Sequence, residues 1–343
     1  MTRLRAAGNR STAVASIVST TIWFLACCNS PSFPQDPKDS KPTATNNRDS
    51  IAVHVDAISI RCDRVEFYLE QTVPQWPVAD AMQPRLRAEA LEHLIRRQLI
   101  ANFLQGEKYA ATAVEISWRL DELREELARV DQQLTDHLKK MRLTEVELKQ
   151  EIAWQIAWQK FLDEKLTAAA LQTYYDQHRR DFDGTEIRVA QILFAPATAP
   201  SPANQPMEQA ATTKAKLVAG QLTWTEAVEQ FSTAPSKRDA GNLGWIRRHE
   251  PMPEEFSKAT FQLNVGEIAD PFQTIFGTHL VKCLEIRPGK KLLGDVRDEV
   301  LRAATTHWFQ SLADESRAQA VIKYSDFFPH LDATGTLALP KDH

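Results

Sequence analysis

The segment from Gly241 to His279 constrains the fold of this chain more than any other part of the sequence. It contains a Gly-x-Leu-Gly-Trp turn, a Met252/Phe256 pair, a second turn at Val265–Ile268 and the sequence Phe276–His279, which runs directly into an apolar strand. One glycine-rich turn alone would mean little, whereas several elements at fixed spacings form a specific pattern. The segment therefore predicts one particular type of domain.

Strand and helix patterns surround this segment. The composition changes at Asp183-Gly184, after which short apolar runs indicate strands, and apolar residues three and four apart indicate helices. We predict strands at Glu186–Phe194, Pro271–Thr274 and His279–Ile286, and helices at Met207–Ala219, Trp224–Phe231 and Phe256–Leu263. Helices packed on a small antiparallel sheet, for which we expect four strands, give an α+β domain over residues 183–289.

The order of these elements resembles the parvulin family of peptidyl-prolyl cis-trans isomerases, whose domains are also called PpiC or rotamase domains. The resemblance implies an enzyme that isomerises X-Pro peptide bonds without a cofactor or a metal. It also implies a substrate-binding pocket for the proline ring, formed by Leu243, Met252 and Phe256.

The same resemblance implies a polar centre beside the pocket. Thr274 and His279 match the Thr and His that the family carries late in the domain. Gln191 stands where the family has a His in its first strand, and Ala234 stands where it has an Asp or a Cys. Gln191 can still form a hydrogen bond, whereas Ala234 cannot. We therefore expect Gln191, Thr274 and His279 to be the catalytic residues of an enzyme with weakened activity.

The residue types suit this chemistry. Isomerisation must overcome a barrier of about 18–20 kcal/mol that comes from amide resonance, and it needs neither a nucleophile nor a metal. An apolar pocket that grips the proline ring and removes water from the amide favours the twisted state. Two alternatives stay open: the three pocket residues could be ordinary core residues, and His279 could mainly hold the sheet together.

A helical block precedes this domain. Alternating apolar residues predict a strand at Ile51–Ile60, and Thr144 and Glu147 have the spacing of a capping box. We predict helices around Val65–Leu69, Leu86–Phe103, Val114–Val130 with a continuation to Met141, Thr144–Phe161 and Thr167–Tyr175. In layout, residues 51–182 resemble the helical N-terminal region of exported chaperone-isomerases, the SurA-like and PrsA-like foldases.

A last amphipathic helix is predicted over Leu293–Ala320. In the chaperone-isomerases that the chain resembles, such a helix folds back onto the N-terminal region. We therefore expect an α+β fold in which a helical chaperone-like domain at 51–182 and a parvulin-like domain at 183–289 are closed by a C-terminal helix at 290–325, with a tail at 326–343.

The N-terminus has the pattern of an export signal. Arg3, Arg5 and Arg10 precede an uncharged run at Ser11–Ala26, which is shorter than the roughly 20 residues of a membrane-spanning helix. We predict a signal peptide at 1–27 whose end resembles a bacterial lipobox, with Cys27 as the lipidated residue and Cys28 as the alternative. The polar, proline-containing stretch at 28–50 predicts a flexible tether to a membrane. The expected location is the cell envelope or periplasm.

Composition excludes other classes. A net charge of −4 and a pI of about 6.2 give no basic field for nucleic acid. Apart from the pair at 27 and 28, only Cys62 and Cys283 remain, and no metal-binding spacing is present. These two cysteines could form a bridge in an oxidising compartment, although two buried free thiols fit a chain of this size better.

Two functional hypotheses follow. In the first, the chain is an exported, membrane-tethered isomerase and foldase whose partners are unfolded or X-Pro-containing polypeptides. In the second, motivated by Gln191 and Ala234, it is a non-catalytic holdase chaperone with a degenerate parvulin domain. A structural envelope lipoprotein is a third reading. The sequence leaves the oligomeric state open.

Overall fold

The computed structural model describes residues 50–74, 76–195, 205–249, 251–274, 276–333 and 335–340. The predicted signal peptide at 1–27, its Cys27 and Cys28, and the predicted tether as far as residue 49 lie outside the described residues. Within the described ranges, no helix is both long enough and apolar enough to cross a bilayer.

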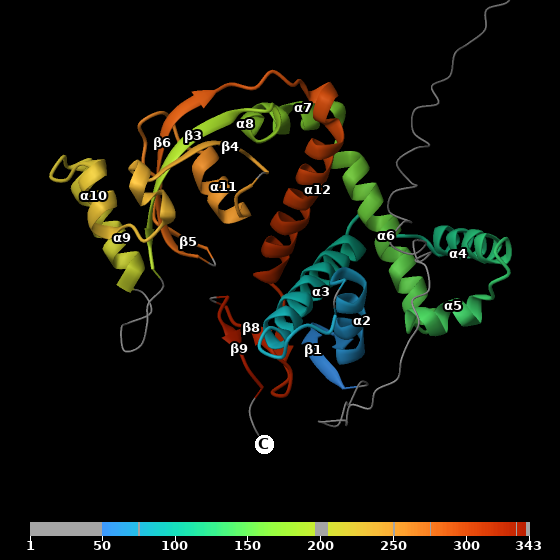
Figure 1. Cartoon of the computed structure of the whole chain (residues 1–343). Coiled ribbons are helices and arrows are strands. Elements are labelled where there is room, and N and C mark those ends of the chain that lie inside the picture. The colour runs from blue at the N-terminus through green and yellow to red at the C-terminus, as the bar shows by residue number, and fades with distance from the viewer. Residues whose placement is uncertain are drawn as a thin grey trace, which may run out of the picture. The chain divides into compact units, whose positions relative to one another are not determined.

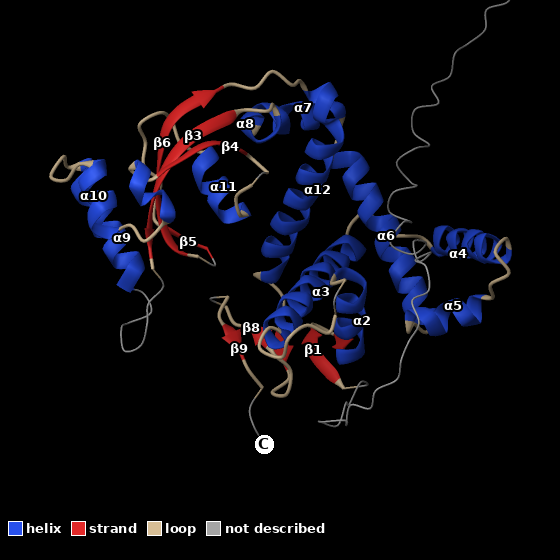
Figure 2. Cartoon of the chain, viewed as in Figure 1, coloured by secondary structure: helices blue, strands red, loops and turns tan. Residues whose placement is uncertain are grey.

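Helices and antiparallel strands make up the described chain, which confirms the predicted α+β class (Figures 1 and 2). The helices of the first half are α2 (Cys62–Thr72), α3 (Gln83–Gly106), α4 (Ala113–Ala128), α5 (Leu134–Met141), α6 (Glu145–Lys165), α7 (Ala168–Gln177) and α8 (Arg179–Phe182). Those of the second half are α9 (Gln205–Val218), α10 (Trp224–Phe231), α11 (Glu254–Phe261) and α12 (Leu293–Arg317), with a 3-10 turn at Pro235–Asp239. The longer strands are β1 (Ile51–Val55), β2 (Ile58–Arg61), β3 (Glu186–Phe194), β4 (Asn242–Arg247), β5 (Phe272–Thr274), β6 (Gly277–Arg287) and β7 (Ile322–Tyr324), and β8 (His330–Leu331) pairs with β9 (Leu337–Ala338).

Local signals in the sequence set several of the helix ends. The Thr144 side chain accepts a hydrogen bond from the backbone N–H of Glu147, whose carboxylate bonds back to the cap residue, so the predicted capping box is confirmed. The pattern predicted to continue from Val114 to Met141 is instead divided between α4 and α5. Asp131 lies between them with a positive φ of 54°, a conformation that interrupts a right-handed helix.

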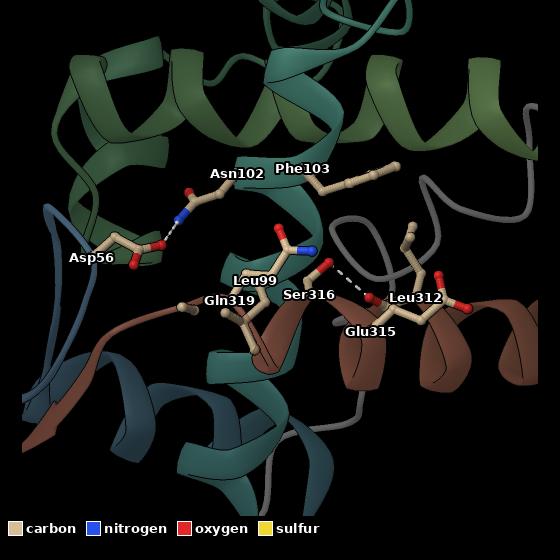
Figure 3. Close-up of a pocket in the computed structure, with 9 residues that line it drawn as sticks. Asp56, Leu99, Asn102, Phe103, Leu312, Glu315, Ser316 and Gln319 are labelled. Carbon is tan, nitrogen blue, oxygen red and sulfur yellow. Dashed lines mark hydrogen bonds between the residues drawn. The ribbon is translucent and has the colours of Figure 1, made fainter.

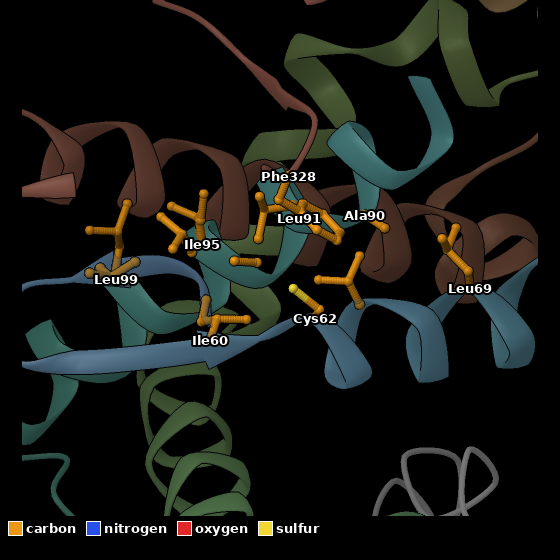
Figure 4. Close-up of a cluster of buried hydrophobic side chains, with 12 residues drawn as sticks. Ile60, Cys62, Leu69, Ala90, Leu91, Ile95, Leu99 and Phe328 are labelled. Carbon is orange, nitrogen blue, oxygen red and sulfur yellow. The ribbon is translucent and has the colours of Figure 1, made fainter. Parts of the chain in front are cut away.

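Residues 51–61 form a hairpin rather than the predicted single strand. β1 and β2 pair antiparallel across a turn in which Asp56 has a φ of 54°. β7 pairs with the other side of β1, so the sheet order is β2-β1-β7. A core cluster under this sheet joins it to α2 and α3 and includes Cys62, Leu91 and Ile95 (Figure 4).

The chain after α12 returns to this cluster. Phe328 packs in it, although the sequence predicts a tail at 326–343 (Figure 4). The helix α12 itself lies beside α3, where Leu312 and Leu99 face a cavity of about 240 Å³ between the two helices (Figure 3). Arg317 of α12 also bonds both carboxylate oxygens of Glu92 on α3, at 2.8 and 3.0 Å. The C-terminal helix therefore packs against the helical N-terminal region.

The second sheet has the order β4-β3-β6-β5 with antiparallel pairing throughout, as predicted. The Gly-x-Leu-Gly-Trp sequence, predicted as a turn, is instead the start of the edge strand β4. The φ values of Gly241 and Gly244 are +81° and +77°, which other residues rarely adopt. The two glycines are therefore explained by their positive φ and not by a reversal of the chain.

Helices cover both faces of this sheet. The helices α9 and α10 pack on one face and α11 packs on the other. Buried strand residues on the first face are Ile192, Phe194 and Leu280, and those on the second are Ile187, Val189, Val281 and Cys283. Even and odd residue numbers separate the two faces, as the two-residue period of a strand requires.

We predict that Gly241→Ala destabilises the protein more than Gly244→Ala does. A positive φ costs either alanine roughly 1–3 kcal/mol. A Cβ at Gly241 would in addition lie 2.3 Å from the backbone oxygen of Gln191, whereas no atom lies within 4 Å of one at Gly244. Urea unfolding midpoints of the two variants measure the difference, and equal midpoints would contradict the close approach of β4 to β3.

Candidate active site

Strand register gathers four side chains on the α11 face of the second sheet. The pairing of β3 with β6 sets Gln191 and His279 two residues apart in register and on the same face. On the neighbouring strand β5, Phe272 pairs directly with His279, and Thr274 follows two residues later. The β5–β6 hairpin and the distant strand β3 therefore supply one site.

A hydrogen-bonded chain joins the three polar residues that the sequence singles out. His279 Nε2 lies 2.7 Å from Thr274 Oγ1, and His279 Nδ1 lies 3.0 Å from Gln191 Oε1. An amide oxygen can only accept, so Nδ1 carries the proton and donates to Gln191. In the neutral ring Nε2 is then the acceptor, and the Thr274 hydroxyl donates to it. The Phe276 backbone N–H donates to the same hydroxyl oxygen at 3.1 Å, which fixes its orientation.

Aromatic rings enclose the imidazole of His279. Phe272 stacks on it with centroids 5.3 Å apart and an interplanar angle of 11°, and Phe256 meets it edge-on at 5.4 Å. His279 is only 4% exposed, and burial lowers its pKa to about 4, because a charged ring would lose its hydration there. The imidazole is therefore neutral at physiological pH.

The three predicted pocket residues belong to one apolar cluster next to the polar centre. Phe256 of α11 is 1% exposed, while Leu243 of β4 and Met252 are only partly buried against the same cluster. The cluster also contains strand residues of the sheet core, so the pocket residues and the core are continuous. Their role as a proline pocket stays a prediction.

Ala234 contributes no polar side chain. It is buried, and its backbone N–H donates to Ser232 Oγ at 3.4 Å. The Thr233 hydroxyl donates to the backbone oxygen of Leu193 at 3.0 Å, which ties this turn to β3. The turn is therefore held in place by its neighbours, although position 234 lacks the group expected from the family pattern.

One residue of this site has no predicted role. The sequence predicts Phe272 only as part of a strand, yet it covers one side of the His279 ring. The alternation of Phe272 and Thr274, both on one face of β5, was the signal that could have found it.

Neither cysteine takes part in the site. Cys62 and Cys283 are both free and buried, and they belong to the separate clusters of the first and second sheets, so the alternative of a bridge is wrong. Among the described residues, no three His, Cys, Asp or Glu side chains lie together in a way that could hold a metal ion.

We predict that His279 makes folding stability depend on pH. Its folded pKa of about 4 lies below the ordinary value of 6.5, so the unfolded state binds the proton more readily. The contribution of neutral His279 to the free energy of unfolding is complete above pH 6.5, falls as the pH drops, and is lost by about pH 4. The lost contribution is on the order of 3 kcal/mol in all. Urea unfolding at pH 7.5, 5.5 and 4.5 should show a shallower loss for His279→Gln, and parallel losses in both proteins would refute this.

Comparison with known proteins agrees with this geometry. Residues 166–298 match the family model of the PPIC-type PPIase domain. The chain is 40% identical over 47 residues to the foldase protein PrsA of Oceanobacillus iheyensis, covering 14% of this chain and 16% of that protein. It is 36% identical over 77 residues to the foldase protein PrsA of Bacillus subtilis strain 168, covering 22% and 25% respectively. The matched segments thus span at most about a quarter of these two relatives.

Solved structures were also found. A crystal structure of the peptidylprolyl isomerase PrsA from Bacillus anthracis aligns with a TM-score of 0.34 and 20% identity over 67% of this chain and 96% of that chain. A PpiC-type peptidyl-prolyl cis-trans isomerase domain aligns with a TM-score of 0.26 and 25% identity over 32% and 98% respectively. The sequence match at 166–298 carries the assignment: this chain contains a PPIC-type PPIase domain, and over short segments it is similar to the PrsA foldases.

Proposed function

We propose that the chain is a peptidyl-prolyl cis-trans isomerase that acts on X-Pro bonds of unfolded polypeptides. The observation that carries the proposal is the neutral, ring-enclosed His279, hydrogen-bonded to Gln191 and Thr274 beside an apolar cluster. A site for this reaction must bind an apolar ring and keep water from an amide, and it needs no charge of its own.

Each group of residues in the site would have its own role in isomerisation. Leu243 and Met252, which are partly buried, would contact the proline ring, and the buried Phe256 would back them from the same cluster. The Thr274 hydroxyl would orient His279, and Gln191 would hold the opposite ring nitrogen. Because the imidazole is neutral, the amide would enter without meeting a formal charge, and loss of its resonance would be favoured by the dry surroundings.

The proposal includes export and tethering. The basic start of the chain, the uncharged run at Ser11–Ala26 and the lipobox-like Cys27 support a signal peptide and a lipid anchor. The polar stretch up to residue 50 would let the folded part stand off the membrane surface of the cell envelope. The division into a helical domain at 51–182, an isomerase domain at 183–289 and a closing helix at 290–325 belongs to the same proposal.

A second function is favoured by one specific observation. Position 234 is a buried alanine, so the polar centre lacks the acidic or thiol group that family members carry there. A site that binds proline without accelerating its isomerisation would make the chain a holdase chaperone.

The variant Ala234→Asp distinguishes the two functions. If the wild-type protein shows no turnover and the variant does, the proline pocket is intact and only the polar centre is incomplete.

We predict that Met252→Ala lowers kcat/KM for a prolyl tetrapeptide by about tenfold, because removing the partly buried side chain loses roughly 1–2 kcal/mol of contact with the ring. A protease-coupled assay or NMR exchange measures the rate. The matched control Val218→Ala alters a side chain that is 72% exposed on α9 and should leave the rate unchanged. Turnover at the uncatalysed level from folded wild type would reject the isomerase proposal.

A further inference from the structure

The connection that carries Met252 is fastened at its two ends by one ion pair. β4 ends at Arg247 and α11 begins at Glu254, with Met252 between them. Arg248, the first residue of this connection, donates from Nη1 and Nη2 to the two carboxylate oxygens of Glu254, at 2.7 and 2.6 Å. A bidentate pair of this kind fixes orientation as well as distance. Arg248 therefore limits where the connection, and Met252 with it, can lie.

The same guanidinium also binds α8, the short helix that precedes β3. Arg248 Nε donates to Oδ1 of Asp181 at 2.9 Å. The side chains of Arg248 and Asp181 are 12% and 18% exposed, whereas that of Glu254 is 64% exposed. An ion pair that is shielded from water is screened less than one at the surface. The contact with α8 is therefore the less screened of the two that Arg248 makes.

The helix α8 is itself held in place on either side of Asp181. Phe182 is buried in an apolar cluster with residues of α12. Arg180 donates from Nη1 to the backbone oxygen of Leu263 at 2.8 Å, just beyond the end of α11. Asp181 lies between these two anchored residues, so it is a fixed partner for Arg248.

Apolar side chains of α8 and α11 belong to different clusters of the described chain. Phe182 packs with Val296 of α12, whereas Phe256 of α11 packs against the second sheet. Residues of both helices, among them Asp181 and Phe261, also line a cavity of about 670 Å³, so side chains do not fill the space between them there. The hydrogen bonds of the two arginines, rather than a shared apolar cluster, therefore join α8 to α11 and to the connection before it.

We infer that Arg248 is a positioning residue of the isomerase site, an inference that rests on the proposed function. Apolar packing on the sheet is not directional, whereas the hydrogen bonds of a guanidinium are. Arg248 fixes the connection between β4 and α11 to α8, and so holds Met252 where the proline ring binds. It touches no substrate and acts through Met252, whose displacement weakens binding of the substrate and of the transition state alike.

Steady-state kinetics of the full chain on a prolyl tetrapeptide test this role. Arg248→Gln should raise KM about fivefold and change kcat by less than about twofold, because a displaced pocket binds substrate and transition state equally less well. The matched control Arg247→Gln removes the neighbouring arginine, which is 70% exposed and pairs with Glu186 instead. It should leave both constants unchanged.

A double-mutant cycle separates positioning from a general effect on the fold. In the Met252→Ala background, Arg248→Gln should lower kcat/KM by less than about twofold, because two residues that act through one contact are not additive. An arginine that only stabilised the protein would give the same fold-change in both backgrounds. Additive effects of the two substitutions therefore overturn the inference.

The position of Met252 can also be followed without turnover, by NMR of the full chain with methyl-labelled methionine. The signal of Met252 is identified by its loss in Met252→Ala. Arg248→Gln should shift this signal and leave those of Met82 and Met141 in place, whereas Arg247→Gln should shift none of them. An unshifted Met252 signal in Arg248→Gln overturns the inference. A wild type without turnover rejects the isomerase proposal instead, and the Met252 signal still decides whether Arg248 places this side chain.

A further variant covers the case in which Arg248→Gln does not fold. The single substitution leaves the carboxylate of Asp181, which is 18% exposed, without its arginine, and an unpaired charge at such a site is destabilising. Arg248→Gln combined with Asp181→Asn removes that charge as well. The combined variant should show the same rise in KM and the same shift of the Met252 signal, and the absence of both changes in the folded protein overturns the inference.

Discussion

The pairing of β3 with β6 is the interaction on which the second half of the molecule depends. These two central strands bring residues about ninety positions apart into register, with Leu193 opposite His279 and Gln191 opposite Val281. Both faces of the pair are buried, one under α9 and α10 and the other under α11. A slip of one residue would move every side chain to the opposite face. The same register therefore fixes the core and the polar centre together.

The polar centre is compatible with this core because it carries no formal charge. A buried imidazolium would require a partner, and the residues that contact His279 are an amide, a hydroxyl and two phenyl rings. Both ring nitrogens of His279 have a hydrogen bond, so the cost of desolvating the ring is largely offset. Gln191 is suited to such a neutral arrangement, since its amide oxygen accepts the Nδ1 proton. The small buried side chain at Ala234 keeps the turn packed without adding a polar group.

The first sheet shows the same dependence on distant parts of the chain. β1 is paired on one side by β2 and on the other by β7, which follows the long helix α12. Phe328 then enters the cluster beneath that sheet. The N-terminal and C-terminal parts of the described chain are thus one folded body.

Features that depend on near neighbours could be predicted from the sequence alone. The capping box at Thr144, the strand Glu186–Phe194, the helix Trp224–Phe231 and the glycine pattern from Gly241 onward are local, because caps, periodicity and positive φ act within a few residues. The turn at Asp56 was missed because a tight hairpin preserves the alternation of its strands. The resemblance to the parvulin family predicts that Gln191, Thr274 and His279 form one polar centre. That Phe272 covers His279 and that Phe328 is core follow from the tertiary structure alone, because the first depends on the pairing of β5 with β6 and the second on packing of the C-terminal segment against the first sheet.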